Sequence, residues 1–168
     1  MKLLALDLSS KSSGIAIFED GNLVRYECIT ATEKDSLVRL EKITDKIMDI
    51  YVKENIDEVI IEDVMPDDVA HNQTVFNVLH YLQASVVLGM HRINPSVKYT
   101  LFTASHWRSL CGIKTGRGIK RDTLKLADMA FVKSKYNLDV NDDIADAICL
   151  GWAYLHPQKE FVTTKKAW

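Results

Sequence analysis

Residues 3–18 read Leu-Leu-Ala-Leu-Asp-Leu-Ser-Ser-Lys-Ser-Ser-Gly-Ile-Ala-Ile-Phe, and this stretch decides the fold. It predicts an apolar strand that ends at one carboxylate, Asp7, then a serine-rich turn and a second strand that begins at Gly14. An acid among aliphatic side chains is costly to desolvate unless a cation meets it. For a single Asp, a cap on the following turn is the simpler interpretation. Three further acids later in the chain favour a functional one.

The hydrophobic pattern of the whole chain predicts an α/β fold with a mixed five-stranded sheet, in which three antiparallel strands precede parallel ones. The strands are expected at residues 2–8, 13–19, 22–29, 56–62 and 98–102. Helices are expected at residues 36–54, about 69–90, briefly around 107–110, 122–135 and about 142–155. The helix at 36–54 separates two strands, so the strand at 56–62 should lie parallel to the first strand.

The length of 168 residues predicts one domain, at residues 1–156, followed by a flexible tail at residues 157–168. Apolar runs long enough to span a membrane are missing, so no membrane partner is expected. The three cysteines, Cys28, Cys111 and Cys149, form no Cys-x-x-Cys pair and are odd in number. They therefore predict buried thiols in a reducing compartment, which means a cytoplasmic protein.

The distribution of charge is more informative than its total. The chain carries a formal charge of −2, but residues 98–135 hold nine Lys or Arg against two Asp. This segment therefore carries +7 and leaves −9 for the remainder. Such a separation can steer a polyanion toward one face of a protein.

Four acids make up the candidate site. Asp7 and Glu62 should lie side by side, because each ends one of two neighbouring parallel strands. Asp143 and Asp146 are three residues apart, so both project from one face of the first turn of the last helix. The helix dipole explains an acid at the start of the helix, but it does not explain Asp146, which lies among apolar residues with no Lys or Arg nearby. A carboxylate in that setting requires a cation.

A site built from four carboxylates, with no His or Cys cluster, favours the hard cations Mg²⁺ and Mn²⁺. Two such ions about 4 Å apart can activate a water and stabilise the leaving oxygen of a phosphodiester.

These residues resemble the RuvC family of Holliday-junction resolvases, which belong to the ribonuclease H-like superfamily. The resemblance rests on the Asp-ended strand with its serine-rich turn and Gly14, the strand ending in Glu62, and Asp143-x-x-Asp146 on a late helix. Residues 61–66 and 70–72 also look like that family's stretch after its second acid.

The resemblance implies a ribonuclease H-like fold and a metal-dependent endonuclease that resolves four-way DNA junctions by paired symmetric nicks. Asp7, Glu62, Asp143 and Asp146 would be the catalytic acids and would bind two Mg²⁺, with Mn²⁺ able to substitute. The enzyme would act as a homodimer in a bacterial or phage-infected cell, and a helicase partner would leave no trace in the sequence. The helix at 69–90 would be either the dimerisation element or a core helix.

Some positions depart from the family pattern. The family commonly has Pro-Gly after the first acid, whereas this chain has Leu8-Ser9. Met65 stands where relatives use an aromatic wedge to separate junction bases. Basic side chains in the family contact phosphates near the metals. The candidates for DNA contact here are Arg108, Lys114, Arg117, Lys120 and Arg121, together with Met65.

Three other functions stay open at this point. A RuvC-like nuclease that cuts other branched DNA or trims ribosomal RNA precursors would use similar acids. An actin-like ATPase or sugar kinase would explain Asp7 and Gly14, but it needs two lobes and leaves Asp143 and Asp146 without a role. A non-catalytic binder of DNA structures would need the basic segment but not four carboxylates.

Overall fold

A computed structural model describes residues 1–65 and 73–157 of the chain. The strands are β1 (Lys2–Asp7), β2 (Ser12–Glu19), β3 (Asn22–Thr30), β4 (Glu58–Asp63) and β5 (Lys98–Thr103). The helices are α1 (Ser36–Lys53), α2 (Gln73–Ile93), α3 (Ala104–Leu110), α4 (Arg121–Tyr136) and α5 (Asp142–Leu155).

The strands form one sheet in the order β3-β2-β1-β4-β5. The pairs β1–β2 and β2–β3 are antiparallel, and the pairs β1–β4 and β4–β5 are parallel. The predicted mixed sheet, with antiparallel strands before parallel ones and helices at its sides, is therefore confirmed.

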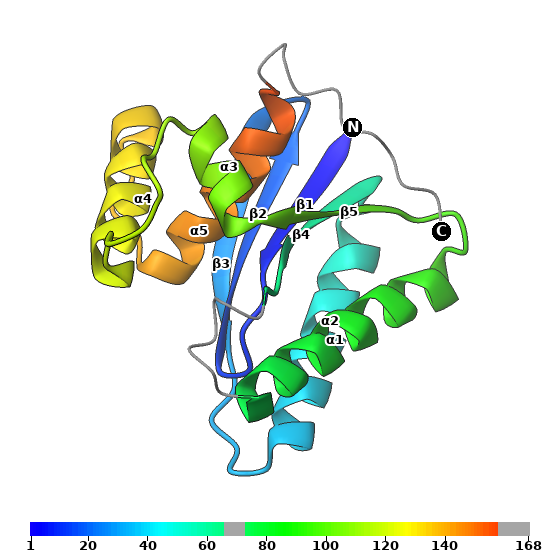
Figure 1. Cartoon of the computed structure of the whole chain (residues 1–168). Helices are drawn as coiled ribbons and strands as arrows, with labels where there is room; N and C mark the ends of the chain where they lie inside the picture. The colour runs from blue at the N-terminus through cyan, green and yellow to red at the C-terminus, as the bar shows by residue number, and fades with distance from the viewer. Residues whose placement is uncertain (66–72, 158–168) are drawn as a thin grey trace.

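Helices cover both faces of the sheet. Figure 1 shows α1 and α2 on one side and α3, α4 and α5 on the other. Because side chains alternate along a strand, β1 serves both layers: Leu4 and Leu6 pack with α1 and α2, whereas Leu3 and Ala5 pack with α5. A strand that is buried on both faces has to be a continuous apolar run, which is how residues 3–6 read.

Side-chain caps fix where two of the helices begin. The Asp35 carboxylate accepts hydrogen bonds from the backbone N–H groups of Leu37 and Val38, at 2.7 and 3.4 Å, and so caps α1. Asn141 accepts one from the N–H of Ile144 at 3.0 Å and caps α5. Such caps satisfy N–H groups that have no partner within the helix. The start of α5 matters most, because it carries two of the four acids.

Two expected features fall partly outside the described residues: the start of the helix expected at 69–90, which the structure describes from Gln73, and the tail, of which only Pro157 is described. No helix in the described part of the chain has the length and apolar character that crossing a membrane requires. The three cysteines are free thiols, of which only Cys149 is fully buried.

Candidate active site

The carboxyl ends of β1 and β4 lie side by side. Leu6 and Ile61 are partners in the parallel register, and the next residue of each strand is an acid, Asp7 and Glu62. Both acids line a cavity of about 790 Å³ at this edge of the sheet. The juxtaposition predicted from the crossover connection is therefore present.

The first turn of α5 brings the other two acids to the same cavity, which Asp143 and Asp146 also line. Gly14 makes this approach possible. A Cβ atom at Gly14 would lie 1.8 Å from the backbone oxygen of Asp143, far closer than two atoms can come without a bond. The absence of a side chain at Gly14 thus allows the helix to start directly against β2.

The electrostatics of the cavity follow from five carboxyl groups in a partly buried space, the four predicted acids and Asp63. Burial raises the pKa of Asp7 well above its ordinary value, and the nearby carboxylates of Glu62 and Asp143 raise it further. Burial also raises the pKa of Asp146 to about 10, with the Asp7 charge as the next contribution. Both shifts mean that the ionised form of each acid is costly in this cavity, and a bound cation would lower that cost.

Two acids that line the cavity, and a third acid beside them, each have a polar partner from another element. The hydroxyl of Ser12 on β2 donates to Oδ2 of Asp143. The indole Nε1 of Trp107 on α3 donates to Oε2 of Glu62 at 2.9 Å. On α5, the acid beside Asp143 is Asp142, and its Oδ2 accepts from Nζ of Lys125 on α4. These contacts hold carboxylates in fixed orientations around the cavity.

Asp146 has a cation as its partner. The expectation that no Lys or Arg is near Asp146 is wrong, because Nη2 of Arg108 lies 3.4 Å from Oδ2 of Asp146. Arg108 is 38 residues away along the chain and reaches Asp146 only because α3 packs against α5. The same guanidinium pairs with Asp128 on α4.

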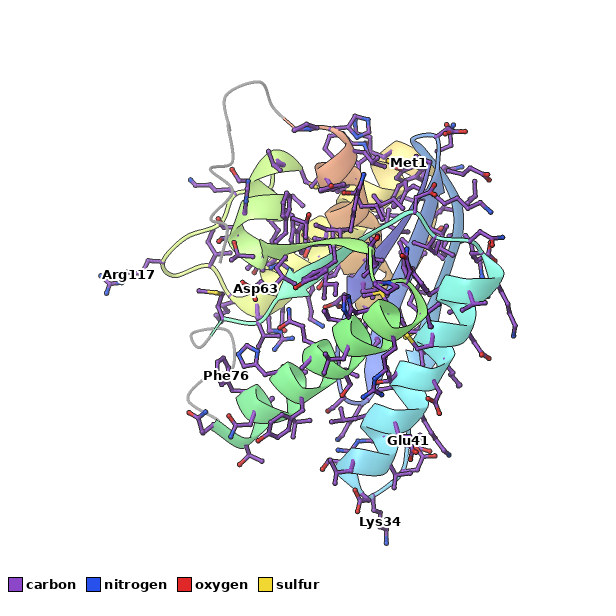
Figure 2. All side chains as sticks on the ribbon, turned by 90° about the vertical axis from the view of Figure 1, so that its right-hand side faces the viewer. Met1, Lys34, Glu41, Asp63, Phe76 and Arg117 are labelled. Atoms are coloured by element: carbon purple, nitrogen blue, oxygen red, sulfur yellow. The ribbon has the colours of Figure 1, made fainter. Side chains whose placement is uncertain are left out.

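The basic residues predicted to contact DNA differ in their exposure and in whether they line the cavity. Lys114, Arg117 and Lys120 are exposed in the segment between α3 and α4, and Figure 2 shows Arg117 projecting away from the molecule. Arg121 is exposed and lines the cavity. Arg108 is only 9% exposed, and this burial favours an internal role over contact with a DNA backbone.

Met65, the predicted wedge, is 41% exposed and follows β4 closely. The neighbouring Asp63 lines the same cavity, and Figure 2 labels it at the end of β4. The residues compared with the family at 70–72 lie outside the described part of the chain.

The donor set fits a hard divalent cation. All four acids offer oxygen, and Oδ1 of Asp146 is buried without a hydrogen-bond partner among the described residues. A buried carboxylate oxygen normally has a partner, so this atom is available to a ligand. Within residues 1–65 and 73–157, however, no three His, Cys, Asp or Glu are already close enough to hold a metal ion.

Sequence reasoning missed the roles of four residues. Ser12 and Trp107 contact acids of the cavity, and Asp128 contacts the guanidinium beside it. Lys125 lines the cavity and pairs with Asp142. Ser12 carried a signal, since it stands in the serine-rich turn after the first acid. Asp128 carried none, because an Asp in an amphipathic helix usually faces solvent.

Comparison with solved structures agrees with this architecture. T. thermophilus RuvC in complex with a Holliday junction substrate matches with a TM-score of 0.70 and 10% sequence identity, covering 93% of each chain. A second structure of Thermus thermophilus RuvC gives a TM-score of 0.69 at 10% identity over 93% of this chain and 94% of that one. The yeast mitochondrial Holliday junction resolvase Ydc2 gives 0.53 at 15% identity, over 90% of this chain and 77% of that one.

No family model and no curated protein sequence matches the chain. At such low identity the likeness lies in the fold and not in the sequence. The sheet, its strand order and its flanking helices are those of the RuvC Holliday junction resolvases.

Proposed function

We propose that the protein is a divalent-metal-dependent endonuclease that resolves four-way DNA junctions by paired symmetric nicks. The observation that carries this proposal is the meeting of four acids from β1, β4 and α5 at one cavity, beside the basic start of α4. A non-catalytic binder would need the basic residues alone. The likeness to a RuvC bound to a Holliday junction substrate supports branched DNA as the substrate.

Asp7, Glu62, Asp143 and Asp146 would hold the metal ions, two Mg²⁺ per site with Mn²⁺ able to substitute. When bound, the ions supply Lewis acidity that lowers the pKa of a water and stabilises charge on the departing oxygen.

The protein's own cations have a separate task. Arg121 and Lys125 line the cavity from the first two turns of α4, where they would attract the phosphate to be cleaved and hold it against the acids. Lys114, Arg117 and Lys120 are exposed and do not line the cavity, so they would bind the DNA arms that extend from it.

A homodimer suits this reaction because a four-way junction has two opposing strands to cut. The outer face of α1 and α2 supports such an assembly. Leu37, Tyr81 and Leu88 are 68%, 58% and 56% exposed and line a groove of about 650 Å³ between the two helices. Glu41 and Asp45 on α1 and Arg92 on α2 line the same groove, so a second copy related by a two-fold axis could pair opposite charges across it.

The deciding experiment incubates the protein and Mg²⁺ with labelled four-way junction, linear duplex, flap and structured RNA. We expect paired nicks near the crossover of the four-way junction and ends that a ligase can seal. Asp7→Asn and Glu62→Gln should bind the junction with nearly wild-type affinity but cut it at least about 100-fold more slowly, because each loses a charged ligand oxygen.

Other results would point elsewhere. Equal cutting of structured RNA would favour a ribosomal RNA-processing nuclease, and preferential cutting of flaps would favour another branched-DNA nuclease. Junction binding with no nicks under Mg²⁺ or Mn²⁺ would refute the nuclease and leave a DNA-structure binder.

A further inference from the structure

A buried ion pair lies directly behind the cavity and joins α3 to α4. Nε of Arg108 donates to both carboxylate oxygens of Asp128, at 2.9 and 3.2 Å, and Nη2 lies 2.8 Å from Oδ2. The Asp128 side chain is completely buried and the Arg108 side chain is 11% exposed. Because two donors grip one carboxylate, the plane of the guanidinium is fixed.

The same guanidinium faces the site on its other side. Nη2 of Arg108 approaches Oδ2 of Asp146 to 3.4 Å, and Oδ1 of Asp146 is the buried oxygen without a partner among the described residues. Arg108 also lies over the ring of Trp107, 4.2 Å from its centroid, and that ring orients Glu62. Two consecutive residues of α3 thus contact acids from two different elements.

Stability alone does not explain such a pair. Taking two charges out of water costs several kcal/mol, and apolar residues of similar volume often serve the fold equally well. Asp128 is the more telling member, because it is absent from the lining of the cavity. It meets the site through Arg108 and through Asp146, whose pKa is raised mainly by burial and in part by the charge of Asp128 and a hydrogen bond to it. Its position therefore indicates a role that is exerted on the guanidinium and the carboxyl group beside it.

The two contact lengths define that role. Nη2 of Arg108 lies 2.8 Å from Oδ2 of Asp128 and 3.4 Å from Oδ2 of Asp146, so the guanidinium interacts more strongly with Asp128. The charge of Asp128 offsets much of the positive charge of Arg108 at the site. Arg108 can then direct one oxygen of Asp146 without competing strongly with a metal ion for the carboxylate. Without Asp128, the same guanidinium would be drawn to Asp146 and would occupy its oxygens.

We propose that Arg108 is a positioning residue for Asp146, and that Asp128 is the anchor that holds the guanidinium back so that Oδ1 of Asp146 stays free for a divalent cation. This inference deepens the proposed function, since it rests on Asp146 as a metal ligand. In this proposal Arg108 supports the metal site and does not contact the DNA backbone.

The first test measures Mn²⁺ binding without DNA, by electron paramagnetic resonance titration of the full chain. Asp128→Asn keeps the shape of the anchor but removes its charge, so Arg108 should shift toward Asp146. Mn²⁺ affinity should fall about 10-fold, at the lower end of the range for loss of an outer-shell partner. A folded Asp128→Asn protein with wild-type Mn²⁺ affinity would overturn the proposal.

The second test asks whether the defect comes from the released guanidinium. In the double variant Asp128→Asn/Arg108→Gln, the two amides can hydrogen-bond to each other and no cation is left to compete. Mn²⁺ affinity should return to within about threefold of wild type, a strongly non-additive result. A double variant as weak as Asp128→Asn alone would mean that the pair only supports the fold, and would count against the anchor role.

The control is Asp139→Asn, the same substitution in an exposed ion pair, in which Asp139 lies 2.5 Å from Lys133 and its side chain is 85% exposed. Its Mn²⁺ affinity should match wild type. If Asp128→Asn does not fold by circular dichroism, Arg108→Lys takes its place, because it keeps the charge but loses the fork that reaches both acids. Its Mn²⁺ affinity should fall about 10-fold, and unchanged affinity would overturn the proposal.

Wild-type junction nicking, measured beside these titrations, separates the two proposals. If wild type binds Mn²⁺ and Asp128→Asn binds it more weakly, but neither cuts DNA, the proposed function fails and the anchor stands. If wild type cuts the junction and Asp128→Asn keeps full Mn²⁺ affinity, the anchor alone fails.

Discussion

Trp107 donates a hydrogen bond of 2.9 Å from its indole Nε1 to Oε2 of Glu62, and so fastens the carboxylate at the end of β4 to helix α3. Trp107 is also fully buried, which gives the indole little freedom to move. The orientation of a proposed metal ligand thus depends on a side chain that the charge pattern does not reveal. A Trp107→Phe substitution removes this hydrogen bond but keeps an aromatic ring at the position.

Trp107→Phe should bind four-way junctions normally but cut them about 10- to 100-fold more slowly, because Glu62 loses a donor that orients it. Trp152→Phe on α5 is the matched control, since Trp152 contacts the rings of Phe131 and His156 outside the cavity. Cleavage rates at saturating Mg²⁺, compared with junction affinity, check the prediction. A Trp107→Phe enzyme with wild-type turnover would contradict it.

Without metal, the stability of the protein should fall as pH rises. The folded-state pKa of Asp146 is about 10 and that of Asp7 is also raised, whereas both are near 4 in the unfolded chain. Between these values the folded state binds more protons than the unfolded state, so the stabilising contribution is present at low pH and is lost toward high pH. The slope should be on the order of 1 kcal/mol per pH unit.

Urea unfolding in EDTA between pH 5.5 and 7.5 measures this slope, and the N-terminal amine, whose pKa is raised by its hydrogen bond to Asp20, stays charged over that range. Asp146→Asn should flatten the slope and stabilise the metal-free protein at pH 7.5. Stability that is level or increases over this range in wild type would show that the acids do not share buried charge.

Gly14→Ala should displace α5 and with it Asp143. The added Cβ would lie 1.8 Å from the backbone oxygen of Asp143, so the helix has to move, at a cost of about 1–3 kcal/mol in the free energy of unfolding. We expect Mn²⁺ binding and cleavage to be lost together. Gly21→Ala is the control, because it has open space around it and a positive φ of 85°, so it strains only a distant turn. Equal Mn²⁺ affinity in the two variants would contradict the argument.

If the groove between α1 and α2 is the dimer interface, a single charge introduced there should prevent dimerisation. Leu88→Glu should convert a dimer into a monomer, because it puts a carboxylate on the apolar surface that would be buried. Leu126→Glu on α4 is the control, since Leu126 is 63% exposed and lies outside the groove. Light scattering coupled to gel filtration gives the mass of each. A wild-type protein that is monomeric at micromolar concentration would refute the dimer.

Periodicity predicted the elements well because each one has a face that must be buried. In α1, for example, Leu40, Ile43, Ile47 and Ile50 recur at helical spacing, and all four are buried. Leu37 continues the same spacing but is 68% exposed, since the helix begins beyond the sheet at that point. A pattern therefore predicts which face points inward, but not how far the partner layer extends.

The meeting of Asp7 and Glu62 was predictable because sheet topology determines where strands end, whereas the partners of the candidate acids were not predictable. Arg108 and Asp128 meet because α3 and α4 both pack near α5, and neither helix encodes that contact in its own spacing. The basic segment at 98–135 indicated an anion, but it did not distinguish exposed cations such as Arg117 from the buried Arg108. Only the packed structure separates the two classes.

Lys125 provides the sharpest test of how the cavity handles a phosphate. Its Nζ pairs with Asp142, and its side chain lines the cavity one turn into α4. Lys125→Met keeps the length of the side chain but removes a charge from the place where the phosphate would lie. We expect cleavage at saturating junction to fall about 100-fold, comparable to the loss of one donor to transition-state charge. The slope of log junction affinity against log salt concentration should decrease by about one, the value for one lost phosphate contact.

Lys133→Met, in the last turn of the same helix, is the matched control, because it removes the same charge from an exposed pair with Asp139 outside the cavity. Its cleavage rate should match wild type. A Lys125→Met enzyme that keeps its rate and loses only affinity would place Lys125 among the general DNA contacts. In that case Arg121, the exposed cation that also lines the cavity, would be the remaining side chain to hold the reacting phosphate.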